Sequence, residues 1–131
     1  EENVSVSVAP ILAGFSLKQM GAAAQAGQSL LDTTIAPPGK SDKKATLIAA
    51  REEVRSGELY YIIEYTVETP RWARHNFAVF VSRDDTLYTF NAQSSRSQWD
   101  KFQAQFSAMV ESFSLLPTSP ESNTQDASYF L

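Results

Sequence analysis

The residues best suited to chemistry in this chain lie in one short stretch, Arg71-Trp72-Ala73-Arg74-His75. His75 is the only histidine, so any histidine-dependent catalysis must use it. A Ser-His-carboxylate triad also needs a serine on a strained turn, but the sequence contains no G-x-S-x-G motif. We therefore expect no hydrolase site here.

Two adjacent carboxylate pairs, Glu52-Glu53 and Asp84-Asp85, could in principle supply a general acid and a general base. The first pair falls in a predicted strand and the second in a predicted turn, where carboxylates are usually solvated surface charges. The chain has no cysteine, which excludes disulfides, thiolate metal sites and cysteine nucleophiles. We expect no catalytic residues and no enzyme activity.

His75 is a weak candidate for a metal ligand. A transition metal needs several nitrogen, sulfur or carboxylate ligands, and the sequence offers no second histidine and no cysteine. We therefore predict no metal site and no cofactor. A histidine that makes a hydrogen bond at the start of a strand is the better interpretation.

The basic stretch itself favours a binding function. The chain carries a net charge of −4 and a pI near 4.9, which argues against nucleic-acid binding. Arginine and tryptophan are enriched at protein interfaces, and Pro70 places this stretch where one strand ends and the next begins. We predict that Arg71, Trp72, Arg74 and His75 contact an acidic partner surface. The alternative is a solvated turn with Trp72 folded onto the core.

The C-terminal residues form a second candidate contact. Residues 117–126 are rich in proline, serine and polar side chains and cannot bury a core, so we predict an extended tail over 116–131. The tail ends in Tyr129, Phe130 and Leu131, which we interpret as either a frayed terminus or a partner-binding segment.

The elements that position these residues follow from hydrophobic periodicity. Alternating or β-branched segments predict strands over 3–8, 46–54, 59–69, 76–81 and 87–93, with Asp84-Asp85 as a hairpin turn. The valines at positions 4, 6 and 8 are expected to face the core. Helical spacing predicts helices over 17–31 and 99–113, the second opened by a capping box at Ser95 and Gln98. The second helix has one apolar stripe: Trp99, Phe102, Phe106, Met109, Val110 and Phe113.

The order of these elements and their wording resemble the PsbP family of the thylakoid lumen, most closely its CyanoP and PsbP-like branch. The resemblance covers residues 1–115 and rests on the segments ENVSVSV, YYIIEYTVE, RHNFAVFVSR, LYTFNAQ, Trp99 and SFSL. It implies an α+β domain in which a twisted antiparallel β-sheet has helices packed on its faces. Family members usually begin with further strands ahead of the position of Asn3, so we expect an exposed sheet edge near the start.

The resemblance also bears on cations. PsbP-family proteins have been described with bound metal ions, and His75 matches one ligand position, so calcium or another cation is possible by family resemblance. The accompanying aspartate falls at Arg96, whose positive charge would repel a cation.

The function that the resemblance implies is a non-catalytic extrinsic subunit, or an assembly or stabilising factor, of a photosynthetic complex. The first choice is photosystem II with its oxygen-evolving complex. The protein would be peripheral to the lumenal face of the thylakoid membrane of a chloroplast or cyanobacterium and would not span it. The alternatives are an assembly factor of photosystem I, a subunit of the chloroplast NADH dehydrogenase-like complex, or a small-ligand or cation-binding lumenal module.

Overall fold

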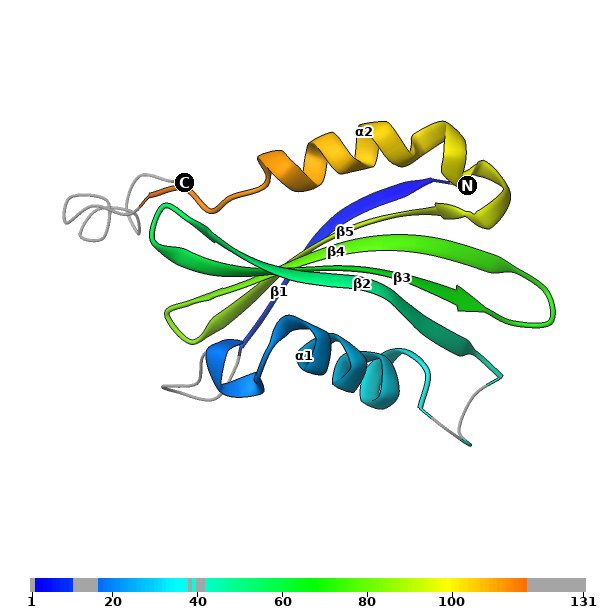
Figure 1. The fold of residues 1–131 in the computed structure, drawn as a ribbon, viewed down its shortest axis with the longest axis horizontal. Helices are drawn as coiled ribbons and strands as arrows, with labels where there is room; N and C mark the ends of the chain where they lie inside the picture. The colour runs from blue at the N-terminus through cyan, green and yellow to red at the C-terminus, as the bar shows by residue number, and fades with distance from the viewer. Residues whose placement is uncertain (1, 11–16, 38, 40–41, 118–131) are drawn as a thin grey trace.

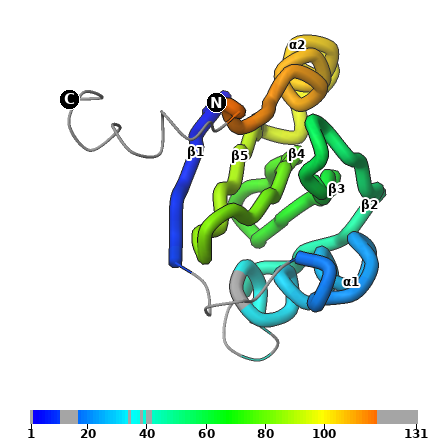
Figure 2. Tube along the Cα trace, turned by 90° about the vertical axis from the view of Figure 1, so that its left-hand side faces the viewer, coloured from blue at the N-terminus to red at the C-terminus, as the bar shows by residue number. Residues whose placement is uncertain are grey.

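The fold is a five-stranded antiparallel sheet with one helix on each face, seen in a computed structural model that describes residues 2–10, 17–37, 39 and 42–117 (Figure 1). The elements are β1 (Asn3–Pro10), α1 (Ala23–Leu30), β2 (Lys44–Arg55), β3 (Glu58–Glu68), β4 (Ala73–Arg83), β5 (Thr86–Ser95) and α2 (Trp99–Ser112). The strand order is β1-β5-β4-β3-β2, so β4 is the central strand. Figure 2 shows the sheet between the two helices. The predicted α+β class is therefore confirmed.

Strands β2 to β5 form a meander because tight turns join each to the next. Asp84 and Asp85 both have positive φ, at 52° and 60°, which is the backbone twist that a two-residue antiparallel hairpin requires. The β2–β3 turn uses the same geometry at Ser56 (φ 51°) and Gly57 (φ 82°). The hairpin predicted at Asp84-Asp85 is confirmed.

The two faces of the central strands carry two apolar clusters, as the alternation in β3 predicts. On the α2 face the buried side chains are Tyr60, Ile62, Val79, Val81, Phe90 and Ala92, together with Trp99, Phe106 and Val110 of α2. On the α1 face a second cluster contains Ile63, Tyr65, Val67, Ala78 and Leu31. The apolar stripe of α2 therefore packs on the sheet. The capping box predicted at Ser95 and Gln98 does not form, because Ser95 precedes a 3-10 turn (Arg96–Gln98) and its side chain makes no cap hydrogen bond.

The first helix is shorter than predicted. A 3-10 turn over Leu17–Met20 precedes α1, and a π-helical turn over Leu31–Ile35 follows it. The break before α1 falls at Gly21, whose φ of 92° cannot be accommodated inside a helix. Gly27 allows α1 to lie close to the sheet, because a Cβ at this position would stand 3.1 Å from Ile63 Cγ2.

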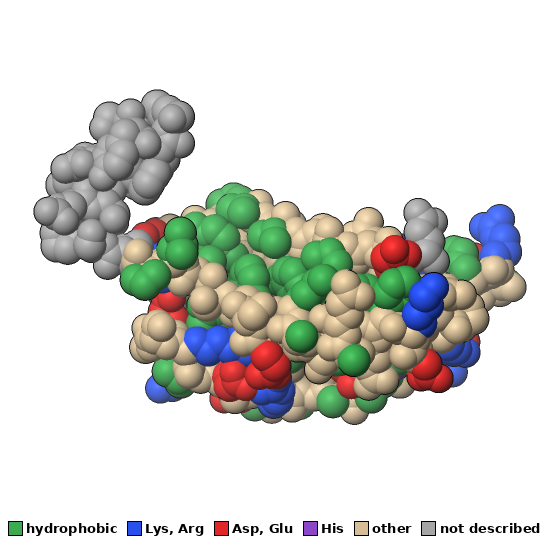
Figure 3. Space-filling view, turned by 90° about the horizontal axis from the view of Figure 1, so that it is seen from above, with side chains coloured by type: hydrophobic (Ala, Val, Ile, Leu, Met, Phe, Trp, Pro, Cys, Tyr) green, Lys and Arg blue, Asp and Glu red, His purple; other side chains and the backbone are tan. Residues whose placement is uncertain are grey.

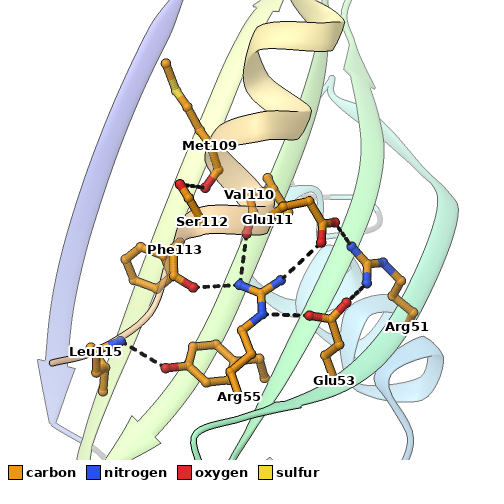
Figure 4. Close-up of polar contacts among 10 residues, drawn as sticks. Arg51, Glu53, Arg55, Met109, Val110, Glu111, Ser112, Phe113 and Leu115 are labelled. Atoms are coloured by element: carbon orange, nitrogen blue, oxygen red, sulfur yellow. Dashed lines mark hydrogen bonds and ion pairs between the residues drawn. The ribbon is translucent and has the colours of Figure 1, made fainter. Parts of the chain in front are cut away.

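The C-terminal end of α2 is fixed to β2 by Arg55 (Figure 4). The Nη1 group of Arg55 donates to the carbonyl oxygens of Val110 (2.9 Å) and Phe113 (2.6 Å) at the end of the helix. The Val110 oxygen also accepts a longer hydrogen bond, of 3.4 Å, from the backbone N–H of Phe113. Its Nε lies 2.7 Å from Oε1 of Glu53, and hydrogen bonds from Arg55 and Arg51 hold the pKa of Glu53 below its ordinary value. This charged network joins α2 to the edge strand β2.

Strand β1 is an edge strand, and its valines are exposed. Val4, Val6 and Val8 pair with β5 residues of the α2 face, yet they are 45%, 56% and 61% exposed. The expectation that they face a core was wrong, because α2 lies over the middle of the sheet and leaves β1 uncovered (Figure 2). Figure 3 looks down on this side of the molecule and shows a band of apolar side chains. The exposed edge expected near the start of the chain is present.

Among the described residues, no helix has both the length and the apolar character needed to cross a membrane.

Candidate functional site

The basic stretch predicted to bind a partner lies at the turn between β3 and β4, and this turn is held by its own hydrogen bonds. The backbone N–H of Thr69 donates to the carbonyl oxygen of Trp72 at 2.8 Å. The hydroxyl oxygen of Thr69 accepts from the backbone N–H groups of Arg71 (3.1 Å) and Trp72 (3.2 Å). The turn is therefore shaped in advance and presents Arg71 and Trp72 to solvent.

Trp72 stands at the surface rather than in the core. It is 38% exposed, and the guanidinium carbon of Arg74 lies 5.2 Å from the centroid of its ring. A cation within about 6 Å of an aromatic ring is attracted to the ring face. Arg74, half-buried at the start of β4, therefore forms one group with the exposed Trp72 of the turn.

The arginines of this turn differ from all the others in the chain. The sequence has six arginines, and Arg51, Arg55, Arg83 and Arg96 each form an ion pair with a glutamate. In the part of the chain that the structure describes, Arg71 and Arg74 have no carboxylate oxygen within 4.0 Å. An acidic chain thus keeps two guanidinium groups without a described ion-pair partner close together, one in the turn and one at the start of β4.

A hollow of about 420 Å³ adjoins Trp72, lined by Trp72, Ala73, Ser95, Arg96 and Ser97. Its far wall follows β5, because Arg74 is paired with Ser95 in the sheet. From the sequence alone, Arg96 is recognised only as the residue that replaces a metal ligand. In the structure Arg96 lines the same hollow as Trp72, and it pairs with Glu68 at 3.3 Å. The register of the β4–β5 hairpin could have shown that Arg96 lies near Arg74. We call Arg71, Trp72, Arg74 and Arg96 the basic corner.

His75 lies apart from the basic corner, although it follows Arg74 in sequence. Neighbouring strand residues point to opposite faces of a sheet, and His75 points toward α2. Its ring stacks on Trp99 with a centroid distance of 3.8 Å and an interplanar angle of 6°, and its Nε2 lies 2.7 Å from Oε2 of Glu64. Only 14% of its side chain is exposed, so His75 is placed to hold the start of α2 against the sheet.

His75, the weak candidate for a metal ligand, has one carboxylate beside it in the structure. Glu64, which sequence reasoning missed as a neighbour of His75, brings one carboxylate to the histidine. Within the described ranges, no three His, Cys, Asp or Glu side chains gather where they could share a metal ion. A histidine and one carboxylate are fewer ligands than a stable site uses.

The carboxylate pairs have structural roles. Glu52 accepts a hydrogen bond from the backbone N–H of Ala23 at 2.9 Å, at the start of α1, and Glu53 pairs with Arg55. Asp84 and Asp85 form the β4–β5 turn. The predicted contact residues Tyr129, Phe130 and Leu131 lie outside the described residues.

The corner offers several groups for binding: guanidinium groups, an aromatic surface and serine hydroxyls around a hollow.

The fold that carries this corner, a five-stranded sheet with one helix on each face, can be compared with known proteins. The chain is 32% identical over 118 residues to PsbP domain-containing protein 7, chloroplastic, of Arabidopsis thaliana, a match that covers 88% of this chain and 42% of that protein. It is 33% identical over 119 residues to CyanoP of Thermosynechococcus vestitus, covering 87% of this chain and 64% of the relative. The chain thus spans between two fifths and two thirds of the length of these relatives.

The fold comparison agrees with the sequence comparison. The solution structure of CyanoP from Synechocystis sp. PCC 6803 superposes with a TM-score of 0.74 at 28% identity, covering 88% of this chain and 68% of that one. The family model of PsbP matches residues 1–115, which include every described strand and helix. On the agreement of sequence, strand order and fold, the chain belongs to the PsbP family.

Proposed function

We propose that this protein is a non-catalytic accessory subunit or assembly factor of a photosynthetic complex, located in the thylakoid lumen, with photosystem II as its first partner. Membership of the PsbP family and relatives from a chloroplast and a cyanobacterium support the photosynthetic role. The observation that carries the binding role is the basic corner, where Arg71 and Arg74 lack ion-pair partners among the described residues of an acidic chain.

The proposed mechanism is complementarity of shape and charge, with no chemistry of its own. The β3–β4 turn, which carries Arg71 and Trp72, forms one end of the sheet (Figure 1), so it can reach into a concave surface that the flat sides of the domain cannot enter. Complementary charges mainly accelerate association and select the partner, and they act best at low salt. The protein would thus remain peripheral to the membrane while it contacts acidic lumenal loops of the complex.

The first test is cross-linking mass spectrometry of the full chain added to solubilised thylakoid complexes, through lysines such as Lys18, Lys44 and Lys101. We expect cross-links to lumenal loops of core photosystem II subunits. Cross-links confined to photosystem I or to a dehydrogenase complex would change the partner and leave the accessory role. No cross-links above background, where known lumenal subunits do cross-link, would contradict the proposal.

The second test asks whether the basic corner carries the contact. Arg71→Glu with Arg74→Glu should weaken capture of the complex and reduce its salt dependence, because each change reverses an uncompensated charge. Lys18→Glu is the control matched in charge to the single change Arg71→Glu, since Lys18 is an exposed cation on the 3-10 turn before α1, near the β2–β3 hairpin at the opposite end of the sheet. Equal effects of these two single changes would mean that net charge, and not this corner, governs binding.

A further inference from the structure

We propose that the basic corner recognises a carboxylate-rich segment of a protein partner, with an apolar side chain of the same segment placed in the hollow against Trp72. This inference rests on the proposed docking function and specifies the chemistry of the partner. It is carried by four features of the corner: uncompensated arginines, an exchangeable ion pair, a mixed apolar and hydroxyl lining, and a turn that is already in place.

The first feature selects an anion. The guanidinium groups of Arg71 and Arg74 have no carboxylate within 4.0 Å among the described residues, whereas the other four arginines do. A guanidinium group presents a planar fork of donors that matches the two oxygens of a carboxylate. The corner is therefore best satisfied by carboxylates that the partner supplies.

The second feature adds a third arginine. Arg96 pairs with Glu68 at 3.3 Å, and their side chains are 53% and 40% exposed. A long, solvent-exposed pair of this kind contributes little to stability, so Arg96 can exchange Glu68 for a carboxylate of the partner at small cost.

The third feature selects a peptide rather than a free anion. The hollow of about 420 Å³ has Trp72 and Ala73 on one side and the serines Ser95 and Ser97 on the other. An indole ring offers apolar contact. The two hydroxyl oxygens lie 3.3 Å apart and share one hydrogen bond, and each keeps lone pairs that can accept from a peptide backbone N–H. A segment that alternates acidic and apolar residues would use all of these groups at once.

The fourth feature lowers the cost of binding. The hydrogen bonds between Thr69 and the backbone of residues 71–72 hold the turn in shape, and Arg74 already stands over the Trp72 ring. Binding to a preformed surface avoids the loss of conformational entropy that ordering a loop would require.

An anionic membrane surface fits the corner less well than a peptide does. Lipid-binding basic clusters contain roughly four to eight lysines or arginines, whereas this corner has three arginines, one of them paired. The site is also a hollow beside one tryptophan rather than a broad apolar face.

The inference can be tested on the full chain with a short, acetylated and amidated peptide that alternates glutamate and leucine. Binding is followed by isothermal titration and by fluorescence, because Trp72 is 38% exposed while Trp99 is 6% exposed and shielded in the core. We expect saturable binding that weakens as salt rises, and roughly five- to tenfold weaker binding by the Arg71→Gln, Arg74→Gln double variant. Trp72→Ala should weaken binding further than Trp72→Phe, and Lys18→Gln should bind like the wild type.

Three outcomes would overturn the inference: equal binding of a peptide in which glutamine replaces glutamate, unchanged binding by the double arginine variant, or binding to phosphatidylglycerol vesicles but not to the peptide. The proposed function fails separately, through the loss of cross-links to photosynthetic complexes. If the chain cross-links to a complex but does not bind the peptide, the proposed function stands and the inferred ligand is wrong. If the chain binds the peptide but forms no cross-links, the ligand class stands and the proposed function is wrong.

Discussion

Replacing Arg55 by methionine should remove much of the anchorage of α2. The Arg55 side chain is 12% exposed and donates to the carbonyl oxygens of Val110 and Phe113 at the end of the helix, where the backbone N–H of Phe113 gives Val110 only a longer hydrogen bond of 3.4 Å. Hydrogen bonds to charged groups contribute about 1.5–3 kcal/mol each, and water can reach part of this site, so we take the lower value for both bonds. Methionine retains the apolar stem. The expected loss is about 3 kcal/mol, or about 10 °C in the melting temperature of a domain of this size.

The matched control is Arg51→Met, two residues earlier on the same strand. Arg51 also pairs with Glu53 and Glu111, but its side chain is 45% exposed and it reaches no helix carbonyl. Exposed ion pairs contribute about 0.2–1 kcal/mol, so this variant should lose less than about 1 kcal/mol. Urea unfolding followed by circular dichroism gives both values, provided the slopes of the two transitions agree. Equal losses in the two variants would refute the role assigned to the helix-end carbonyls.

Three further changes test other parts of the fold. Burial raises the pKa of Tyr65 to about 12, whereas the same phenol in the unfolded chain has a pKa of about 10. The stability that neutral Tyr65 contributes is therefore complete below about pH 10. As the pH rises toward about 12, the free energy of unfolding should fall by up to about 2 kcal/mol. Urea midpoints between about pH 9 and 11 should fall less steeply for Tyr65→Phe. Gly27→Leu should cost about 1–3 kcal/mol in thermal unfolding, because Ile63 is buried and cannot move away from the added side chain; an unchanged melting temperature would show that α1 can shift. Val6→Lys should change stability by less than about 0.5 kcal/mol and reduce association in light scattering, since Val6 is 56% exposed on an edge strand.

Local pattern predicted the centre of the fold well. Strand β3 places Tyr60 and Ile62 on one face and Ile63 and Tyr65 on the other, as its alternation requires. The turn at Asp84 and its neighbour was predictable because few residues tolerate positive φ in a tight hairpin.

The misses came from information that is not local. The alternation of Val4, Val6 and Val8 shows which side chains share a face, but it cannot show whether another element covers that face. The helical spacing of apolar residues over 17–31 does not reveal that Gly21 has a positive φ, which interrupts the helix. In both cases the missing knowledge concerned the three-dimensional setting of a correctly read pattern.

The site was predictable only in part for the same reason. Arg71, Trp72 and Arg74 are neighbours in sequence, so composition was enough to find them. Arg96 joins them through the pairing of β4 with β5, which required the hairpin register. His75 could have been separated from the corner by strand alternation alone, but its contact with Glu64 depends on the β3–β4 register.

The pairing of β1 has a consequence for folding. Strands β2 to β5 are each joined to the next by a short turn, so their contacts close small loops, whereas Val6 of β1 must meet Phe90 across most of the chain. Closing so long a loop costs more entropy and slows the step. The pairing of β1 with β5 buries little apolar surface to offset this cost, because every residue of β1 is exposed. We therefore expect β1 to join the meander last, and its backbone amides to exchange with solvent faster than those of β3 and β4 in the native state.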